Sequence, residues 1–297
     1  MRIKRTLMFC LTVCVVMGLT GCGNGNARNE ENSREKTEGL EELGEIAVIS
    51  REEGSGTRDT FAVLADFTAE GIQTDQKDLT REDVVIVNDA AAVIREVENG
   101  EGAIGYVSAG SLQNEEAVKA LHVDGIAPEE TGRYPLERSF YLAYCGKLSE
   151  LERDFLTYVG SRGQEIVGEN YIPIAKSNTF LSNKEEGTLT IAGSTSVAPL
   201  MEELADAYME LNPNAKIIIQ ATDSTDGLTQ AMAGTCDLGM SSRELKDYET
   251  ELLDYEVIAR DRIAVIVNAQ NPLNNITLEQ IKGIYVGEIK EWQELNQ

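Results

Sequence analysis

From about Glu45 onward, apolar and polar positions follow two alternating periods along the chain. Short apolar runs predict buried strands, and these lie at 46–49, 84–87, 102–107, 189–192, 217–219 and 263–267. Between them, apolar residues recur at i, i+3 and i+4, which predicts helices at 57–67, near 90–97 and at 197–208. This alternation of strand and helix is typical of βα units and predicts an α/β fold with a largely parallel sheet.

The N-terminus has a different pattern. Three basic residues within 2–5 precede an apolar run at 7–19, which is too short for a membrane-spanning helix and predicts a signal peptide. The run ends in Leu-Thr-Gly-Cys, which resembles the lipobox of bacterial lipoproteins. This resemblance implies that residues 1–21 are removed and that Cys22 carries lipid. The alternative is an ordinary secretory signal with an incidental cysteine.

Two polar segments are predicted to lie outside the packed core. Residues 22–44 are acidic and contain few large apolar side chains, so we expect a flexible tether. Residues 177–187, which read SNTFLSNKEEG, are a candidate linker. A tether behind a lipid anchor would place the folded part outside the cytoplasm, on the outer face of the cell membrane.

Composition narrows the choice of partners. The chain has 297 residues, 42% of them hydrophobic, which suits one large globular domain or two smaller ones. Its formal net charge of -25 repels nucleic acid and anionic membrane, so we expect no nucleic-acid partner and membrane contact through the lipid anchor only. Once the signal and the lipidated cysteine are set aside, Cys145 and Cys236 remain, and we expect two separate buried thiols rather than a disulfide.

Turns rich in serine, threonine and glycine follow several of the predicted strands. The first turn of a helix presents unpaired N–H groups and the positive end of the helix dipole, and hydroxyl and arginine side chains add further donors. A single turn of this kind is usually only a helix cap. Several of them at the carboxyl edge of one sheet favour a bound oxyanion. The turns lie at 50–57, 193–196, 222–227 and 241–243.

The residues that enzymes usually need do not form a recognisable set. The 54–57 segment, Gly-Ser-Gly-Thr, lacks the glycine spacing and the lysine of a Walker loop. His122 is the sole histidine and lies in no catalytic or metal-ligand motif. Glu52 and Glu53 indicate a solvated turn rather than an acid/base pair. We therefore expect a binding protein that is not an enzyme and uses no cofactor or metal.

Four segments together resemble a known family. GSTSVAP, CDLGMSSREL, SREEGSGTRD and IKGIYVGEIKEWQEL are similar to segments of the substrate-binding lipoprotein of bacterial ABC phosphate importers, and the resemblance covers nearly all of residues 46–297. It implies the two-domain periplasmic-binding-protein fold of type II, the Venus-flytrap fold, which closes over its ligand. It also implies binding of inorganic phosphate outside the cytoplasm and delivery to ABC permease subunits.

The order of these segments differs from the family pattern, because SREEGSGTRD precedes GSTSVAP. The chain therefore resembles a circularly permuted member. This order predicts one lobe from 45–142 plus 263–297 and a second from 143–262, with hinges near 142 and 263. A domain-swapped dimer and a fragment of a longer tandem protein are the alternatives.

The resemblance also implies a set of ligand residues. Hydroxyl donors and backbone N–H groups of two turns on one lobe would face an arginine and a glycine-containing turn on the other. The positions that match the family motifs are Thr195, Ser196, Ser224, Ser242, Arg51, Ser55, Gly56 and Thr57.

Ser242 departs from the family pattern, because some members place there an aspartate that accepts a proton of phosphate. A carboxylate at this position selects a protonated oxyanion over sulfate. Asp223, Asp226 or Glu53 could substitute for it, and Arg243 is a candidate additional cation.

Other functions remain compatible with the same turns. The missing aspartate allows a receptor for another oxyanion, such as sulfate, molybdate or tungstate. A phosphate sensor without transport would have the same sequence features. A phosphoester hydrolase is disfavoured by the single histidine and the lack of metal-ligand spacing.

Overall fold

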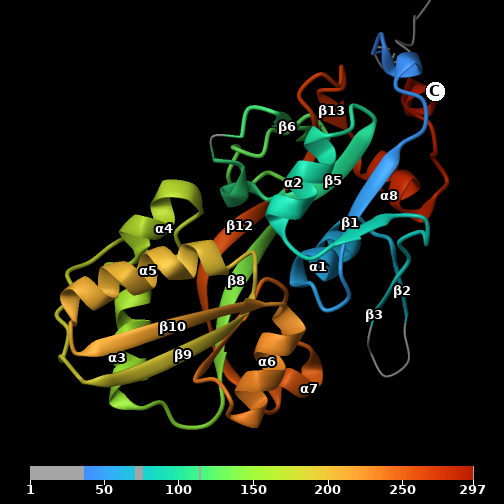
Figure 1. Cartoon of the computed structure of the whole chain (residues 1–297). Helices are drawn as coiled ribbons and strands as arrows, with labels where there is room; N and C mark the ends of the chain where they lie inside the picture. Colours follow the sequence, from blue (N-terminus) through green and yellow to red (C-terminus); the bar gives the residue numbers. More distant parts are fainter. Residues whose placement is uncertain (1–36, 71–75, 114, 297) are drawn as a thin grey trace, which may run out of the picture. The chain divides into compact units, whose positions relative to one another are not determined.

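The structure is a computed structural model that describes residues 37–70, 76–113 and 115–296 (Figure 1). Residues Lys36–Gln297 form one compact unit. The predicted signal peptide, Cys22 and most of the predicted tether lie outside the described residues. None of the described helices is long and apolar enough to cross a membrane.

The strands match the predicted apolar runs and add several that the pattern did not indicate. Most are short, but β12 has 15 residues. Their bounds are β1 Ala47–Arg51, β2 Thr68–Glu70, β3 Gln76–Asp78, β4 Val85–Val87, β5 Ala103–Ser108, β6 Val118–Ala120, β7 His122–Val123, β8 Glu137–Tyr144, β9 Gly187–Ser194, β10 Ala215–Thr222, β11 Leu238–Ser241, β12 Asp254–Asn268 and β13 Asn275–Ile276.

The helices begin at recognisable caps. Ser149 and Thr277 form capping boxes with the glutamate or glutamine three residues later, which satisfies N–H groups at the helix start. The α-helices are α1 Gly56–Leu64, α2 Ala90–Glu98, α3 Glu150–Val159, α4 Gln164–Asn170, α5 Ala198–Leu211, α6 Ser224–Ala233, α7 Asp247–Thr250 and α8 Leu278–Val286; the 3-10 helices are η1 Leu40–Glu42, η3 Ala109–Leu112 and η4 Trp292–Asn296.

A nine-stranded mixed sheet organises the described residues, in the order β10-β9-β11-β8-β12-β5-β1-β4, with β6 also paired to β12. At one end β9 is parallel to β10 and β11, and at the other β1 is parallel to β4 and β5. In the middle, β8 and β12 pair antiparallel with their neighbours. The α/β prediction is confirmed, but the prediction of a largely parallel sheet is wrong for its middle.

Strand β12 connects the two ends of this sheet. Its residues 254–262 pair with β8, and its residues 263–267 pair with β5. Here we call residues 37–136 and 263–296 the α1 half, and residues 137–262 the α5 half. Figure 1 shows α1, α2 and α8 beside β1 and β5, whereas α3 to α7 lie beside the other end of the sheet.

Each half has apolar cores on both faces of its strands. In the α5 half, one cluster packs α3, α4 and α5 against the sheet, and a smaller one lies under α6. In the α1 half, one cluster lies under α1 and α8 and another under α2. Leu40 of η1 is buried in this half, so the packed chain begins earlier than the strand pattern predicts.

The predicted linker and the cysteines also appear in the structure. Residues 177–186 have no helix or strand and are mostly exposed. Cys145 and Cys236 are both free, which confirms the prediction of separate thiols. Cys236 is buried, whereas Cys145 is exposed, so the prediction of burial is wrong for Cys145 because the residue follows the end of β8 at the surface.

Candidate oxyanion-binding site

The first group of predicted ligand residues surrounds the start of α1. Arg51 is the last residue of β1, and Ser55 is the N-cap of α1, where its Oγ accepts the N–H of Arg58 at 3.5 Å. Gly56 and Thr57 are the first residues of the helix. The side chains of this group are almost completely buried. The turn therefore places an arginine, a hydroxyl and helix N–H groups in one enclosed region.

The second group belongs to the α5 half. Thr195 and Ser196 follow β9 and precede α5. Ser224 is the first residue of α6, after β10, and Ser242 follows β11. Because β9, β10 and β11 are neighbouring parallel strands, their carboxyl ends lie at the same edge of the sheet. Three separate turns thereby present their hydroxyl groups together.

The two groups contact each other directly. Arg51 Nη2 donates to Thr195 Oγ1 at 2.9 Å, and the hydroxyls of Thr57 and Ser196 lie 2.7 Å apart. A backbone bond from Thr225 N–H to Gly54 O, at 3.3 Å, also joins the two halves. The structure thus brings the predicted residues together in one cluster, here called the hydroxyl cluster: Arg51, Ser55, Gly56, Thr57, Thr195, Ser196, Ser224 and Ser242.

Gly56 lies where the halves approach most closely. A Cβ atom built on it would lie 2.3 Å from Ser224 Oγ and 2.8 Å from Ser242 Oγ. Both distances are far below an ordinary contact, so only glycine fits in this arrangement. The requirement comes from space, because Gly56 does not have the positive φ that marks other glycines of the chain.

Hydrogen bonds inside the cluster set the direction of its hydroxyl groups. The N–H of Ser242 donates to Ser224 Oγ at 3.1 Å, and the N–H of Ser196 donates to Ser194 Oγ at 3.3 Å. Ser194 Oγ in turn donates to Ser242 Oγ at 2.9 Å. Since these oxygens already accept a bond from the protein, the remaining hydroxyl protons are left to donate. The cluster therefore presents mainly donors, as an oxyanion requires.

Arg51 is held in place by a carboxylate beside it. Its Nε and Nη2 atoms bond both carboxylate oxygens of Glu52 at 2.8 Å, and Nη2 also donates to the backbone oxygen of Asn88 at 3.0 Å. This bidentate pair fixes the plane of the guanidinium group. It also lowers the local net positive charge, so an anion at this place would be attracted by directed donors as much as by charge.

Sequence reasoning missed a second arginine at this site. Arg138 of β8 donates from Nη1 to Thr57 Oγ1 at 2.8 Å and to Ser242 O at 3.3 Å. Its Nε and Nη2 atoms bond Asp261 Oδ2 at 3.0 and 2.8 Å. Burial lowers the pKa of Arg138 and raises that of Asp261, and each charge opposes the shift of the other. Both residues have polar neighbours in the sequence, so no local pattern marked either of them.

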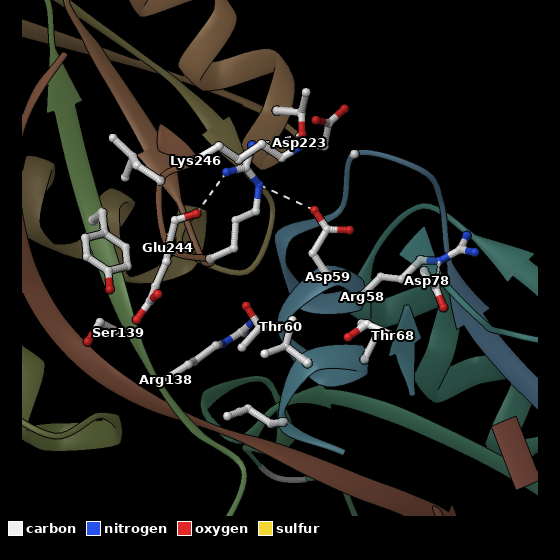
Figure 2. Close-up of a pocket in the computed structure, with 18 of the residues that line it drawn as sticks. Arg58, Asp59, Thr60, Thr68, Asp78, Arg138, Ser139, Asp223, Glu244 and Lys246 are labelled. Atoms are coloured by element: carbon white, nitrogen blue, oxygen red, sulfur yellow. Dashed lines mark hydrogen bonds and ion pairs between the residues drawn. The ribbon is translucent and has the colours of Figure 1, made fainter. Parts of the chain in front are cut away.

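A pocket of about 1330 Å³ adjoins the hydroxyl cluster. Figure 2 shows Asp59 and Thr60 of α1 across the pocket from Asp223 and Lys246 of the α5 half. Cations and carboxylates line the pocket on both sides, together with apolar side chains. Burial raises the pKa of Asp59, and the positive charges of Arg243 and Lys246 oppose this rise.

Other candidates from the sequence have different partners. Arg243 is buried and bonds both carboxylate oxygens of Glu249 at 2.7 and 2.8 Å, and its Nε lies 3.4 Å from Asp59. Asp223 caps α6 by accepting the N–H of Asp226 at 2.8 Å. Asp223, Asp226 and Glu53 line the pocket. These carboxylates therefore lie beside the cluster rather than at the position of Ser242.

Comparison with known proteins identifies the class. The family model described as a PBP superfamily domain matches residues 32–162 and 178–297. The chain therefore belongs to this superfamily, and the predicted periplasmic-binding-protein fold is confirmed.

Individual relatives identify a family within this superfamily. Phosphate-binding protein PstS 2 of Streptococcus pneumoniae is 36% identical over 99% of this chain and 100% of its own length, and its counterpart in Streptococcus agalactiae is 35% identical over 99% of both chains. A crystal structure of the phosphate-binding protein of a phosphate ABC transporter from S. pneumoniae has a TM-score of 0.70 and 36% identity, and covers 85% of this chain and all of that one. The chain is thus a member of the PstS family of phosphate-binding proteins.

Proposed function

We propose that this chain binds inorganic phosphate in the hydroxyl cluster and delivers it to the permease subunits of an ABC importer. The observation that supports this most directly is the contact of Arg51 and Thr57 with Thr195 and Ser196, which unites donors from both halves. The full-length relatives are named phosphate-binding proteins, and one solved structure is described as part of a phosphate ABC transporter. The chain acts as a binding protein and not as an enzyme.

The two halves would act as the two lobes of a closing cleft, with hinges in β8 near 142 and in β12 near 263. Each half has its own apolar cores, and β8 and β12 pass between them. Ligand residues on both sides would separate when the halves open and meet around phosphate when they close. The direct contacts within the hydroxyl cluster correspond to the closed form.

The N-terminal region would anchor the protein on the outer face of the membrane. This rests on the lipobox-like Leu-Thr-Gly-Cys at Cys22 and on the polar segment after it. Replacement of Cys22 by serine should move the protein from the membrane fraction to the soluble extracytoplasmic fraction. Retention of Cys22→Ser in the membrane fraction would contradict lipid anchoring at this residue.

We also propose that the segment order is a circular permutation. The start and end of the packed chain lie side by side: Thr37 N–H donates to Asn296 Oδ1 at 2.8 Å, and Glu45 pairs with Glu291 as a β-bridge. Adjacent ends make permutation physically tolerable. The match to phosphate-binding protein PstS of Bacillus subtilis spans only 40% of this chain, whereas the PstS 2 proteins align over 99%.

Calorimetric titration of the full chain in mild detergent, freed of co-purified ligand, tests the main proposal. Phosphate should bind with measurable heat, and Thr195→Val together with Ser224→Ala should abolish the signal. A wild-type chain that gives no heat with phosphate would contradict the assignment.

A second ligand class is favoured by one feature. Ser242 puts a hydroxyl where a carboxylate would accept a ligand proton, and Ser224 and Ser242 already accept bonds from the protein, so their protons can be offered to a ligand. Sulfate, which has no proton to donate, could therefore compete. Titration of the phosphate-saturated protein with sulfate distinguishes the two: displacement at comparable concentrations favours a general oxyanion receptor, and the lack of displacement favours phosphate.

A further inference from the structure

Arg138 and Asp261 form a buried ion pair between the two long strands that connect the halves. They stand directly opposite each other in the β8–β12 pairing. Asp261 is completely buried and Arg138 is 6% exposed. A pair so deeply buried needs its hydrogen bonds satisfied, because the surroundings no longer supply water.

The pair is connected to both halves of the cluster. The Nη1 atom of Arg138 donates to Thr57 Oγ1, in the α1 half, and to the backbone oxygen of Ser242, in the α5 half. The opposite edge of the guanidinium bonds Asp261, which also accepts the hydroxyl of Ser108 at 2.9 Å. One rigid, planar group therefore holds a ligand residue of each half against a strand common to both.

These contacts have a consequence for Thr57. Its oxygen accepts a bond from Arg138, so its hydroxyl proton is left to donate to Ser196 or to an anion in the cluster. Ser242 is fixed through its backbone, which leaves its side chain free for the cluster. Because Thr57 and Ser242 belong to different halves, the two contacts of Nη1 would be lost together if the halves separated.

We propose that Arg138, held by Asp261, is a positioning residue that couples closure of the halves to oxyanion binding. The inference rests on the proposed function, since it concerns the same cluster. Arg138 acts through Thr57 and the backbone of Ser242, whereas Arg51 carries its own contact to Thr195. A lysine at 138 keeps the charge but has no fork that reaches Asp261, Thr57 and Ser242 at once.

The test is a double-mutant cycle measured by calorimetry with the full chain in mild detergent. We expect Arg138→Lys and Thr57→Val each to weaken phosphate binding roughly 10- to 100-fold, the cost of losing a hydrogen bond to a charged group. The loss in the double variant should be clearly smaller than the sum of the two single losses, because both changes remove the Arg138–Thr57 contact. A residue that only supports the fold would give additive losses.

Arg260→Lys is the matched control. Arg260 lies on β12 next to Asp261 and pairs with Glu137 at 2.5 Å, but its side chain is 43% exposed. Arg260→Lys should bind phosphate within about twofold of the wild type, and its effect should add to that of Thr57→Val, because the Arg260 side chain is partly exposed and, within the part of the chain that the structure describes, bonds Glu137 rather than the hydroxyl cluster.

A second variant covers the case in which Arg138→Lys does not fold. Arg138→Gln with Asp261→Asn removes both charges together, so no buried charge is left unpaired. It should unfold cooperatively without ligand and still bind phosphate at least tenfold more weakly than the wild type.

The outcomes separate this inference from the proposed function. If the wild type binds phosphate or sulfate, the cycle is run with that ion. If Arg138→Lys then binds that ion within twofold of the wild type, or if its loss of affinity adds to that of Thr57→Val, only the positioning role of Arg138 is overturned. If the wild type binds neither ion, both proposals fail.

Discussion

Replacing Gly56 by alanine should weaken phosphate binding without destabilising the unliganded protein. The added Cβ would lie 2.3 Å from Ser224 Oγ, whereas an ordinary contact begins at 3.4 Å. The Ser224 side chain is fully buried and also accepts the N–H of Ser242, so it has little freedom to turn away. The halves would therefore have to separate by about 1 Å in the closed form.

A separation of this size breaks specific bonds. The Thr57–Ser196 contact of 2.7 Å and the Arg51–Thr195 contact of 2.9 Å would both lengthen beyond hydrogen-bond range. One of them involves a charged group, so the combined loss is about 2–4 kcal/mol. This corresponds to binding roughly 30- to 700-fold weaker. In the open form the alanine meets no neighbour from the other half and should stabilise the chain by about 0.4–1 kcal/mol through lower unfolded-state entropy.

Calorimetric titration with phosphate and thermal unfolding without ligand measure the two effects separately. Gly160→Ala is the matched control, because a Cβ at Gly160 would meet only the backbone oxygen of Leu156, at 3.5 Å. Gly160→Ala should leave phosphate affinity unchanged. If Gly56→Ala bound phosphate within twofold of the wild type, the halves would not approach as closely as the structure indicates, and the reasoning would be refuted.

Two further predictions concern specificity and pH. Ser242→Asp adds a carboxylate acceptor beside the hydroxyls of Ser194 and Ser224. In competition titrations, the affinity for sulfate should therefore fall at least tenfold relative to the affinity for phosphate. An unchanged ratio of the two affinities would exclude residue 242 as a determinant of oxyanion specificity. Burial raises the pKa of Tyr106 from 10.0 to about 12, so the folded state retains its proton where the unfolded state loses it, and stability should fall as pH rises between these values. Tyr106→Phe should show a shallower fall in denaturant titrations over that pH range, and an identical slope would contradict this cause.

The sequence pattern predicted the regular elements best where burial follows a simple period. The run at 189–192 lies in β9, and the helical spacing at 197–208 corresponds to α5, with Leu200, Met201 and Leu204 all in the core. Strand β8 was missed because charged and polar residues in its first part interrupt the apolar run. Those residues are polar because this part of the strand lies at the hydroxyl cluster and the pocket, where packing does not decide the residue type.

The turns that hold the candidate ligand residues were predicted from local motifs, and the family resemblance then implied which residues of those turns bind the ligand. A strand, a turn of small hydroxyl residues and a helix start are adjacent in sequence, so the turn at 193–196 could be recognised without knowing the fold, and the resemblance pointed to Thr195 and Ser196 within it. Arg138 and Asp261 have no such motif, and they are 123 residues apart. Only the register of β8 against β12 brings them together, and this register cannot be deduced from the sequence of either strand alone.

The arrangement of charges explains how a protein with a net charge of -25 can be built to hold an anion. Both arginines at the cluster are paired with a carboxylate, Arg51 with Glu52 and Arg138 with Asp261, so neither contributes a full uncompensated charge. What remains is a set of N–H and O–H dipoles fixed in direction by those pairs and by helix starts. Dipoles act over short distances, and acidic residues exposed at the surface are screened by salt and water. The anion would therefore respond to the geometry of the cluster rather than to the charge of the whole molecule.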